Sequence, residues 1–280
     1  MLCALVSDTG AELISVTKNN NEFIWQADPA YWSSHAPILF PVCGRLLSGE
    51  YSYKGISYKM DSHGFAKKSD FILLEQSESH IVLSFSSNEE TKKVYPFDFN
   101  LKASYSIEEE KLIARFEIKN QGNEVMPYMF GWHPGFNLGD KGKIQDHSIY
   151  FDGKENVVWH KLQNGCFVNP YEYHYKLKSG KYFLSEEEIY SNDTIIFANA
   201  GNKVDLLSSD NSRIISLEYS KNLPYLCIWK APYSEARYIC IEPWSDVPSD
   251  GETPENFDTR KMSRLAIGEK IIYKYSVKFN

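Results

Sequence analysis

Residues 111–119 read KLIARFEIK, and apolar and charged side chains alternate along this stretch. Four apolar side chains share one face: Leu112, Ala114, Phe116 and Ile118. The other face is charged apart from Ile113. Because successive side chains of a strand point to opposite faces, this pattern predicts a strand with one face in a core and the other in solvent.

The same two-residue period recurs along most of the chain. It is clear in the C-terminal residues 271–279 and in a series of shorter runs: 11–17, 51–60, 71–75, 80–86, 99–107, 125–131, 194–199, 203–208 and 213–219. Turn signals separate the runs, for example Lys54-Gly55, Gln121-Gly122-Asn123, Asn164-Gly165 and Ser209-Asp210-Asn211. Helical periodicity is confined to short patches at 88–95 and 185–191. Many short strands at this spacing are typical of an all-β sandwich or barrel.

The composition suits a single large domain. Hydrophobic residues make up 42% of the 280 residues, enough for a sizeable core, and the high aromatic content of 15% suits β-sheets. The polar segment 245–260 has strong strands on both sides and therefore reads as a surface loop. We expect residues 1–280 to form one all-β domain.

Several classes of function are disfavoured. A net charge of −7 without a basic cluster argues against a nucleic-acid partner, and no glycine-rich cradle for a nucleotide cofactor appears. The N-terminus has neither a basic leader nor a long apolar run, which predicts a cytoplasmic protein without a membrane span. Five scattered cysteines without a C-x-x-C pair are expected to be reduced thiols: Cys3, Cys43, Cys166, Cys227 and Cys240.

A first candidate for chemistry lies in residues 125–138, which read VMPYMFGWHPGFNL. The apolar strand ends at His133, and Pro134 follows at once. Proline pushes the preceding residue out of the helical region, so we expect His133 to have an extended backbone at a strand end, from which a rigid element aims the ring. The alternative is a histidine that merely caps a strand.

A second candidate lies in residues 238–244, which read YICIEPW. A continuous apolar run predicts a strand buried on both faces, and alternation places Tyr238, Cys240 and Glu242 on one of them. Glu242 is then expected to project from the end of the buried strand, just before Pro243. Burial raises the pKa of a carboxyl group, which suits a general base. The alternative is a buried structural salt bridge.

The two segments together fit a positioned acid and base. Two further pieces are FPVCGRL at 40–46, which ends an apolar stretch with Arg45, and DSHGFA at 61–66, which contains His63. Each of these alone also fits a solvated loop residue.

These segments, in this order, resemble the aldose 1-epimerase (galactose mutarotase-like) family, in particular its LacX-like bacterial branch. The resemblance runs from residues 40–46 through 63–66 and 131–138 to 241–244 and the C-terminal strand. It implies a β-supersandwich of largely antiparallel sheets, with a sugar lying in a cleft on one sheet. No cofactor and no metal ion are implied.

The resemblance also implies roles for individual residues. His133 matches the general acid that protonates the ring oxygen, and Glu242 the general base that takes the proton of the anomeric hydroxyl. His63 matches the second active-site histidine, and Arg45 the arginine that positions the substrate. Asp193 is the nearest match to an acidic residue that grips sugar hydroxyls.

One position departs from the family pattern. Relatives often have a small residue directly before the catalytic histidine, where this chain has Trp132. We expect Trp132 at the cleft, either narrowing it or stacking on the sugar.

The predicted activity is interconversion of the α and β anomers of a free aldohexose. Three alternatives stay open. A hexose 6-phosphate mutarotase would need cations around the phosphate, for which Arg45, Lys230 and Arg237 are available. A carbohydrate-binding protein of the same fold would not catalyse at all. A glycoside hydrolase would need a second carboxylate beside Glu242, for which Asp193 is the candidate. These patterns make no prediction of oligomeric state.

Overall fold

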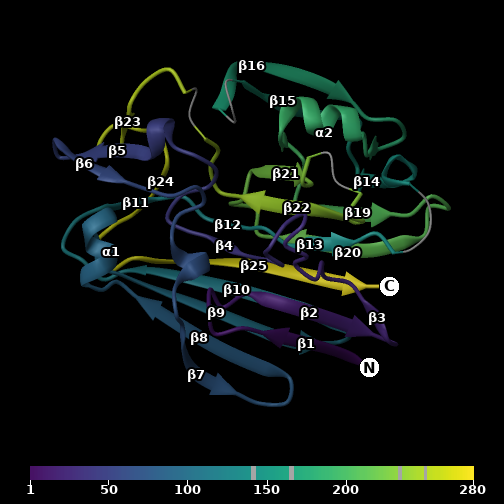
Figure 1. Cartoon of the computed structure of the whole chain (residues 1–280), viewed down its shortest axis with the longest axis horizontal. Coiled ribbons are helices and arrows are strands. Elements are labelled where there is room, and N and C mark those ends of the chain that lie inside the picture. The colour runs from purple at the N-terminus through teal and green to yellow at the C-terminus, as the bar shows by residue number, and fades with distance from the viewer. Residues whose placement is uncertain (140–142, 164–166, 233–234, 249–250) are drawn as a thin grey trace.

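The computed structural model describes residues 1–139, 143–163, 167–232, 235–248 and 251–280, and two large antiparallel sheets form its framework (Figure 1). Nine described strands form the first sheet, in the spatial order β17 (Lys181–Phe183), β14 (Ser148–Phe151), β19 (Lys203–Leu207), β20 (Arg213–Tyr219), β25 (Lys270–Phe279), β10 (Lys111–Asn120), β9 (Phe99–Glu108), β8 (His80–Ser86) and β7 (Ile72–Gln76).

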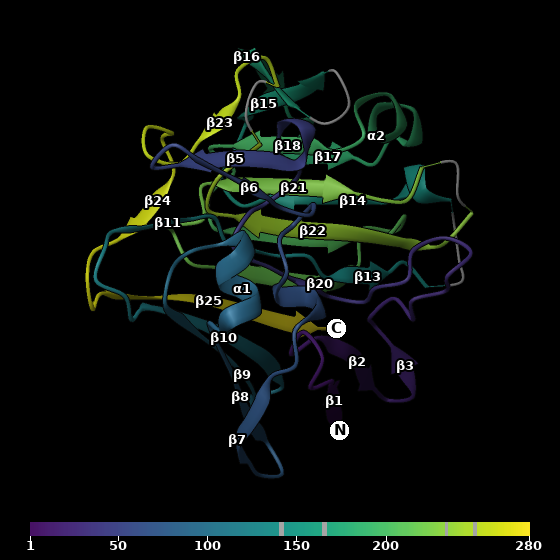
Figure 2. The same ribbon diagram turned by 60° about the vertical axis from the view of Figure 1, so that its left-hand side comes forward.

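The second sheet carries the candidate site. Its described strands follow the order β16 (Phe167–Lys176), β15 (Asn156–Gln163), β18 (Ile195–Ala198), β21 (Tyr225–Trp229), β22 (Tyr238–Trp244), β12 (Gly131–Trp132) and β4 (Ile38–Leu39). A further short strand, β13 (Gly135–Asn137), also pairs with β22. Figure 2 shows this sheet from a second direction.

Small sheets and short helices surround the two large sheets. The strands β1 (Leu2–Val6), β2 (Leu13–Lys18) and β3 (Asn21–Glu22) form one small sheet, β11 (Met126–Tyr128) and β24 (Ser263–Leu265) a second, and β23 (Glu255–Asn256), β5 (Glu50–Tyr53) and β6 (Ile56–Lys59) a third. The helices are α1 (Glu89–Val94), α2 (Glu186–Asn192) and the 3₁₀ turns η1 (Leu47–Gly49), η2 (Ala66–Lys68) and η3 (Ile144–Asp146). None of the described helices is long and apolar enough to cross a membrane.

The main core lies between the two large sheets. Phe116 of β10 is fully buried and contacts Phe130 and Trp132 on the side of the second sheet, with ring centroids 5.3 and 6.0 Å away. The hydroxyl of Tyr275 in β25 donates a hydrogen bond of 3.1 Å to the carbonyl of Pro243 in β22. Aromatic rings thus fill the space between the sheets, which accounts for much of the aromatic content.

The predicted fold class is confirmed. The chain is all-β and largely antiparallel, and the four predicted core residues of 111–119 are all buried in β10. Both helical patches contain short helices. The helix α1 begins at Asn88, whose side chain accepts hydrogen bonds from the backbone N–H groups of Glu90 and Thr91.

Some predicted boundaries are wrong. The run at 125–131 is two strands, β11 and β12, because the N–H of Met129 pairs with the carbonyl of Pro41 and that of Phe130 with the hydroxyl of Ser245. The segment 245–260 is not wholly loop, since β23 within it pairs in parallel with β5. The strands β15, β16 and β21 were not predicted.

The cysteine prediction holds where it is tested. Among the described residues Cys3, Cys43, Cys227 and Cys240 are free thiols. The turn Asn164-Gly165 and Cys166 lie outside the described residues.

Candidate active site

His133 directly follows β12 and has the strand-end position that the sequence predicts. Its backbone N–H donates a hydrogen bond of 3.0 Å to the carbonyl of Pro37, which continues the pairing of β12 with β4. The residue is 6% exposed, and its side chain lines a cavity on the face of the second sheet that points away from the main core. A hydrogen-bonded strand end therefore presents the imidazole to the cavity.

Glu242 lies within β22 rather than at its end. The strand continues through Pro243, whose missing N–H the sheet tolerates, to Trp244, which pairs with both Tyr225 and Gly131. The expectation of a strand-end carboxylate is therefore wrong, although the expected face is right. Tyr238 and Cys240 lie in a small cluster with Trp25, Trp32 and Trp229, separate from the main core.

The two candidate groups face one another. Nε2 of His133 lies 3.3 Å from Oε2 of Glu242, and both side chains are almost fully buried. Three buried atoms of the pair have no hydrogen-bond partner among the described residues: the two carboxyl oxygens of Glu242 and Nδ1 of His133. Buried polar atoms are normally paired, so these atoms point to a polar ligand that completes the site.

The cavity gathers the other predicted residues as well. It has a volume of about 340 Å³, within the range of small-molecule sites. Five predicted site residues line it: Arg45, His63, His133, Asp193 and Glu242. Arg45 is exposed, and His63 and Asp193 are half-buried. A guanidinium group, imidazole rings and carboxyl groups therefore line the same pocket.

Trp132 is the exception, and the expectation that it lies at the cleft is wrong. Its side chain is fully buried in the main core, where it packs against Phe116 and Tyr275, and its indole N–H donates a hydrogen bond of 3.0 Å to the carbonyl of Ala36. The physical reason is the alternation of strand side chains: if residue 133 points to the pocket, residue 132 points into the core.

Other tryptophans supply the aromatic surface of the pocket, namely Trp32, Trp229 and Trp244. Sequence reasoning missed them as site residues. A signal existed for Trp244, because it lies two positions after Glu242 and so shares its face of the strand. Trp32 lies in a loop, where no periodicity marks it.

A tight turn fixes the His63 ring. The backbone of His63 has φ +64°, and that of Gly64 has φ +69°. A Cβ atom at Gly64 would lie 2.2 Å from the carbonyl oxygen of Phe40, so only glycine fits there. The N–H of Gly44 donates to Nδ1 of His63 at 3.1 Å, which assigns the proton of the neutral ring to Nε2.

Burial shifts both members of the central pair toward their uncharged forms. It raises the pKa of Glu242 well above the usual value; the nearby indole of Trp244 acts in the opposite direction, and the charge of Asp193 reinforces the rise. Burial lowers the pKa of His133 to about 3, and the ammonium group of Lys67 adds to the lowering. Without a ligand, burial therefore favours neutral His133 and protonated Glu242.

Two of the three cations considered for a phosphate lie elsewhere. Lys230 is buried with Nζ 5.9 Å from the ring centroid of Tyr190, and neither it nor Arg237 lines the pocket. Arg237 lines a different cavity and donates a hydrogen bond to the carbonyl of Gly139. Lys67, which the sequence did not single out, does line the pocket, and its Nζ donates a hydrogen bond of 2.9 Å to the carbonyl of Ser62.

One group of described residues could hold a metal ion. The donor atoms of His133, Cys240 and Glu242 lie within 4.8 Å of one another. Burial raises the pKa of the Cys240 thiol well above its usual value, which disfavours the thiolate that binds metals. The group therefore fits an acid-base site better than a metal site.

Solved structures match the chain along its whole length. A galactose mutarotase related enzyme from Lactobacillus acidophilus is 30% identical, with a TM-score of 0.92 and coverage of 100% of this chain and 95% of that chain. A galactose mutarotase-like protein from Lactobacillus casei ATCC 334 is 26% identical, with a TM-score of 0.91 and coverage of 100% and 97%. The fold is therefore that of the galactose mutarotase-like proteins.

The family follows from the sequence comparison. A family model described as aldose 1-epimerase matches residues 2–250, and the chain belongs to this family. The plasmid-encoded protein LacX of Lactococcus lactis subsp. lactis is 29% identical over 261 residues, which are 87% of this chain and 84% of that protein. The resemblance seen in the four sequence segments is thereby confirmed.

Proposed function

We propose that this protein is an aldose 1-epimerase that interconverts the α and β anomers of a free aldohexose. The observation that carries the proposal is the separation of 3.3 Å between Nε2 of His133 and Oε2 of Glu242, inside a pocket that also contains polar groups and tryptophans. Membership of the aldose 1-epimerase family supports a sugar as the substrate.

The mechanism needs one base and one acid. Glu242 as carboxylate removes the proton of the anomeric hydroxyl, and His133 as imidazolium donates a proton to the ring oxygen. The C1–O5 bond then breaks and an open-chain aldehyde forms. After rotation about C1–C2, the 5-hydroxyl attacks the other face of the carbonyl, and the two protons return to where they began. Atoms and charges balance without a further reactant.

The number of protons that the pair carries suits this cycle. Neutral His133 with protonated Glu242 holds the same number of protons as the imidazolium with the carboxylate. A sugar hydroxyl that donates to Glu242 stabilises the carboxylate, and the proton then moves over the short distance to His133. Substrate binding would thus convert the resting pair into the reactive one.

The remaining pocket residues take binding roles in this proposal. His63, with its proton on Nε2, can donate a hydrogen bond to a sugar oxygen, and Arg45 can do the same from its exposed position. Asp193 accepts hydrogen bonds from sugar hydroxyls. The tryptophans Trp32, Trp229 and Trp244 supply apolar surface for the C–H face of the ring.

A hexose 6-phosphate is the second candidate substrate. The observation that favours it is the presence of two cationic side chains, Arg45 and Lys67, in the lining of the same pocket. Charged donors of this kind bind phosphate well.

A polarimetric or NMR anomerisation assay tests the proposal, with freshly dissolved α-D-galactose, α-D-glucose and α-D-glucose 6-phosphate. We expect the free sugars to equilibrate faster than in buffer. A preference for the phosphorylated sugar would favour the second candidate. If the protein bound sugar but the anomers equilibrated only at the buffer rate, it would be a carbohydrate-binding protein. Release of nitrophenol from a nitrophenyl glycoside would mean a hydrolase.

We also propose that residues 1–280 fold as one domain. Strand β25, at the C-terminal end, lies between β10 and β20 in the first sheet, so that distant parts of the chain share one core. A cytoplasmic location stays a prediction from the sequence.

A further inference from the structure

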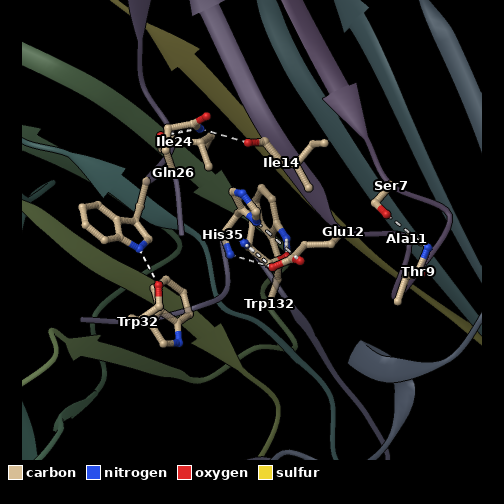
Figure 3. A network of polar contacts seen from close by, with 12 residues as sticks. Ser7, Thr9, Ala11, Glu12, Ile14, Ile24, Gln26, Trp32, His35 and Trp132 are labelled. Atoms are coloured by element: carbon tan, nitrogen blue, oxygen red, sulfur yellow. Dashed lines mark hydrogen bonds and ion pairs between the residues drawn. The ribbon is translucent and has the colours of Figure 1, made fainter. Parts of the chain in front are cut away.

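The loop 32–37 lies along one wall of the pocket and is held by a carboxylate from outside the site. Oε1 of Glu12 accepts hydrogen bonds from the backbone N–H groups of His35 and Ala36, at 2.7 and 3.0 Å. Oε2 of Glu12 lies 3.6 Å from Nδ1 of His35. Figure 3 shows the Glu12 side chain reaching His35. One carboxylate thus forms a clamp, since it holds two successive peptide groups of the loop.

The same loop holds His133 from two directions. The carbonyl of Pro37 accepts the hydrogen bond from the N–H of His133, and the ring of Trp32 packs on the His133 ring with centroids 4.9 Å apart and planes at 32°. The carbonyl of His35 accepts a hydrogen bond of 2.9 Å from the N–H of Gly135. The position of the loop therefore helps to set the position of the imidazole.

Glu12 is itself anchored to the body of the protein. The carbonyl of Ala11 accepts a hydrogen bond of 2.8 Å from the hydroxyl of Tyr105 in β9, and the N–H of Ser7 donates one of 2.8 Å to the carbonyl of Glu12. The N–H of Gly10 donates to the carbonyl of Ser69, next to η2. The carboxylate therefore links the loop to the first large sheet.

We propose that Glu12 is a positioning residue for His133, acting through the loop 32–37. Its carboxylate holds the loop in the conformation that places Pro37 and Trp32 against the histidine. The predicted effect on rate rests on the proposed epimerase function, but the effect on the loop does not.

Glu22 offers a matched control. Its carboxylate also binds two backbone N–H groups, those of Val16 and Ile24, at 2.9 and 2.8 Å, and accepts a hydrogen bond from the hydroxyl of Ser15. These contacts hold the turn between β2 and β3 and the residues just after it. Glu22→Gln therefore weakens a comparable clamp that does not touch the loop 32–37.

The first measurement is steady-state anomerisation. We expect Glu12→Gln to lower kcat by about tenfold, with a smaller change in KM, because the amide oxygen still accepts the backbone hydrogen bonds but without the negative charge that strengthens them. Glu22→Gln is expected to keep kcat within about twofold, as for substitutions away from the site. Glu12→Asp, which keeps the charge but shortens the side chain, is expected to lie between wild type and Glu12→Gln, and it carries the test if Glu12→Gln does not fold. Wild-type kcat in Glu12→Gln, or an equal loss in Glu22→Gln, would overturn the proposal.

The second measurement is amide hydrogen exchange, which does not depend on activity. We expect faster exchange at residues 33–37 in Glu12→Gln but not in Glu22→Gln. Unchanged exchange in Glu12→Gln overturns the positioning role whatever the enzyme does. If the wild type did not anomerise sugars but Glu12→Gln still showed faster amide exchange, the proposed function would be overturned, and the role of Glu12 in holding the loop would be supported.

Discussion

The imidazole of His133 and the carboxyl group of Glu242 lie 3.3 Å apart, Nε2 to Oε2, and burial drives their pKa values in opposite directions. The pKa of the histidine falls and that of the carboxyl group rises. At any pH between these two pKa values, the pair therefore holds a single proton. Because the groups are in contact, their titration steps belong to the pair rather than to either residue. An acid and a base that exchange one proton are what ring opening requires.

Glu242→Gln and His133→Asn each remove one member of this pair. We expect either substitution to lower kcat/KM for anomerisation by at least about two orders of magnitude, the lower part of the range for a positioned acid or base. Initial rates from polarimetry, corrected for the buffer rate, measure the effect, and circular dichroism checks the fold. Arg237→Gln serves as the control, since Arg237 lines another cavity. Near-normal activity in either site variant would remove that residue from the mechanism.

The dependence of kcat/KM on pH follows from the same two shifts. We expect a broad plateau over the range in which the pair holds one proton. The acid limb appears where the pair takes up a second proton, at low pH because burial lowers the pKa of His133 to about 3. The alkaline limb appears where the pair loses its last proton, at high pH because burial raises the pKa of Glu242 well above the usual carboxyl value. An acid limb at the ordinary histidine pKa, about 6.5, would contradict the buried environment inferred for His133.

Glu242 should also make stability depend on pH. Its pKa in the folded protein is raised above that in the unfolded chain, so its contribution to stability is full below the unfolded pKa and is lost as pH rises through the folded value. Glu242→Gln has no such proton to lose. We therefore expect the free energy of unfolding, measured in urea, to fall less with rising pH in the variant than in wild type. Parallel curves for the two proteins would show that the carboxyl group is not buried as described.

Local patterns in the sequence predicted the parts of the fold that depend on local alternation. The buried face of β10 follows directly from KLIARFEIK, and the pocket agrees with the strand-end position inferred for His133 and with the strand face inferred for Glu242. The placement of Trp132 was within reach of the same argument, since adjacent strand residues face opposite ways.

Other features depend on contacts between distant segments, and no local pattern contains them. The parallel pairing of β23 with β5 joins residues from the two ends of the chain. The clamp formed by Glu12 and the contact of Trp32 with His133 arise only when the loop 32–37 folds back on the second sheet. Loops of this kind carry no periodicity, and polar residues within them look like ordinary solvated positions.

Lys67 allows a final test of the electrostatics of the pocket. Its ammonium group lines the pocket and lowers the pKa of both His133 and His63. Lys67→Met removes this positive charge, so a second proton on the pair becomes easier to add. We expect the acid limb of kcat/KM to move to higher pH in the variant.

The neighbouring Lys68 provides the control for this shift. Lys68 is exposed and forms an ion pair of 3.3 Å with Asp61, outside the lining of the pocket. Lys68→Met is expected to leave the acid limb of kcat/KM in place, because solvent screens an exposed charge. An equal shift in both variants would mean that net charge, rather than the position of Lys67, governs the protonation of His133. A loss of activity in Lys67→Met confined to glucose 6-phosphate would instead assign Lys67 to phosphate binding, since a cation that meets the substrate's phosphate contributes nothing to a free sugar.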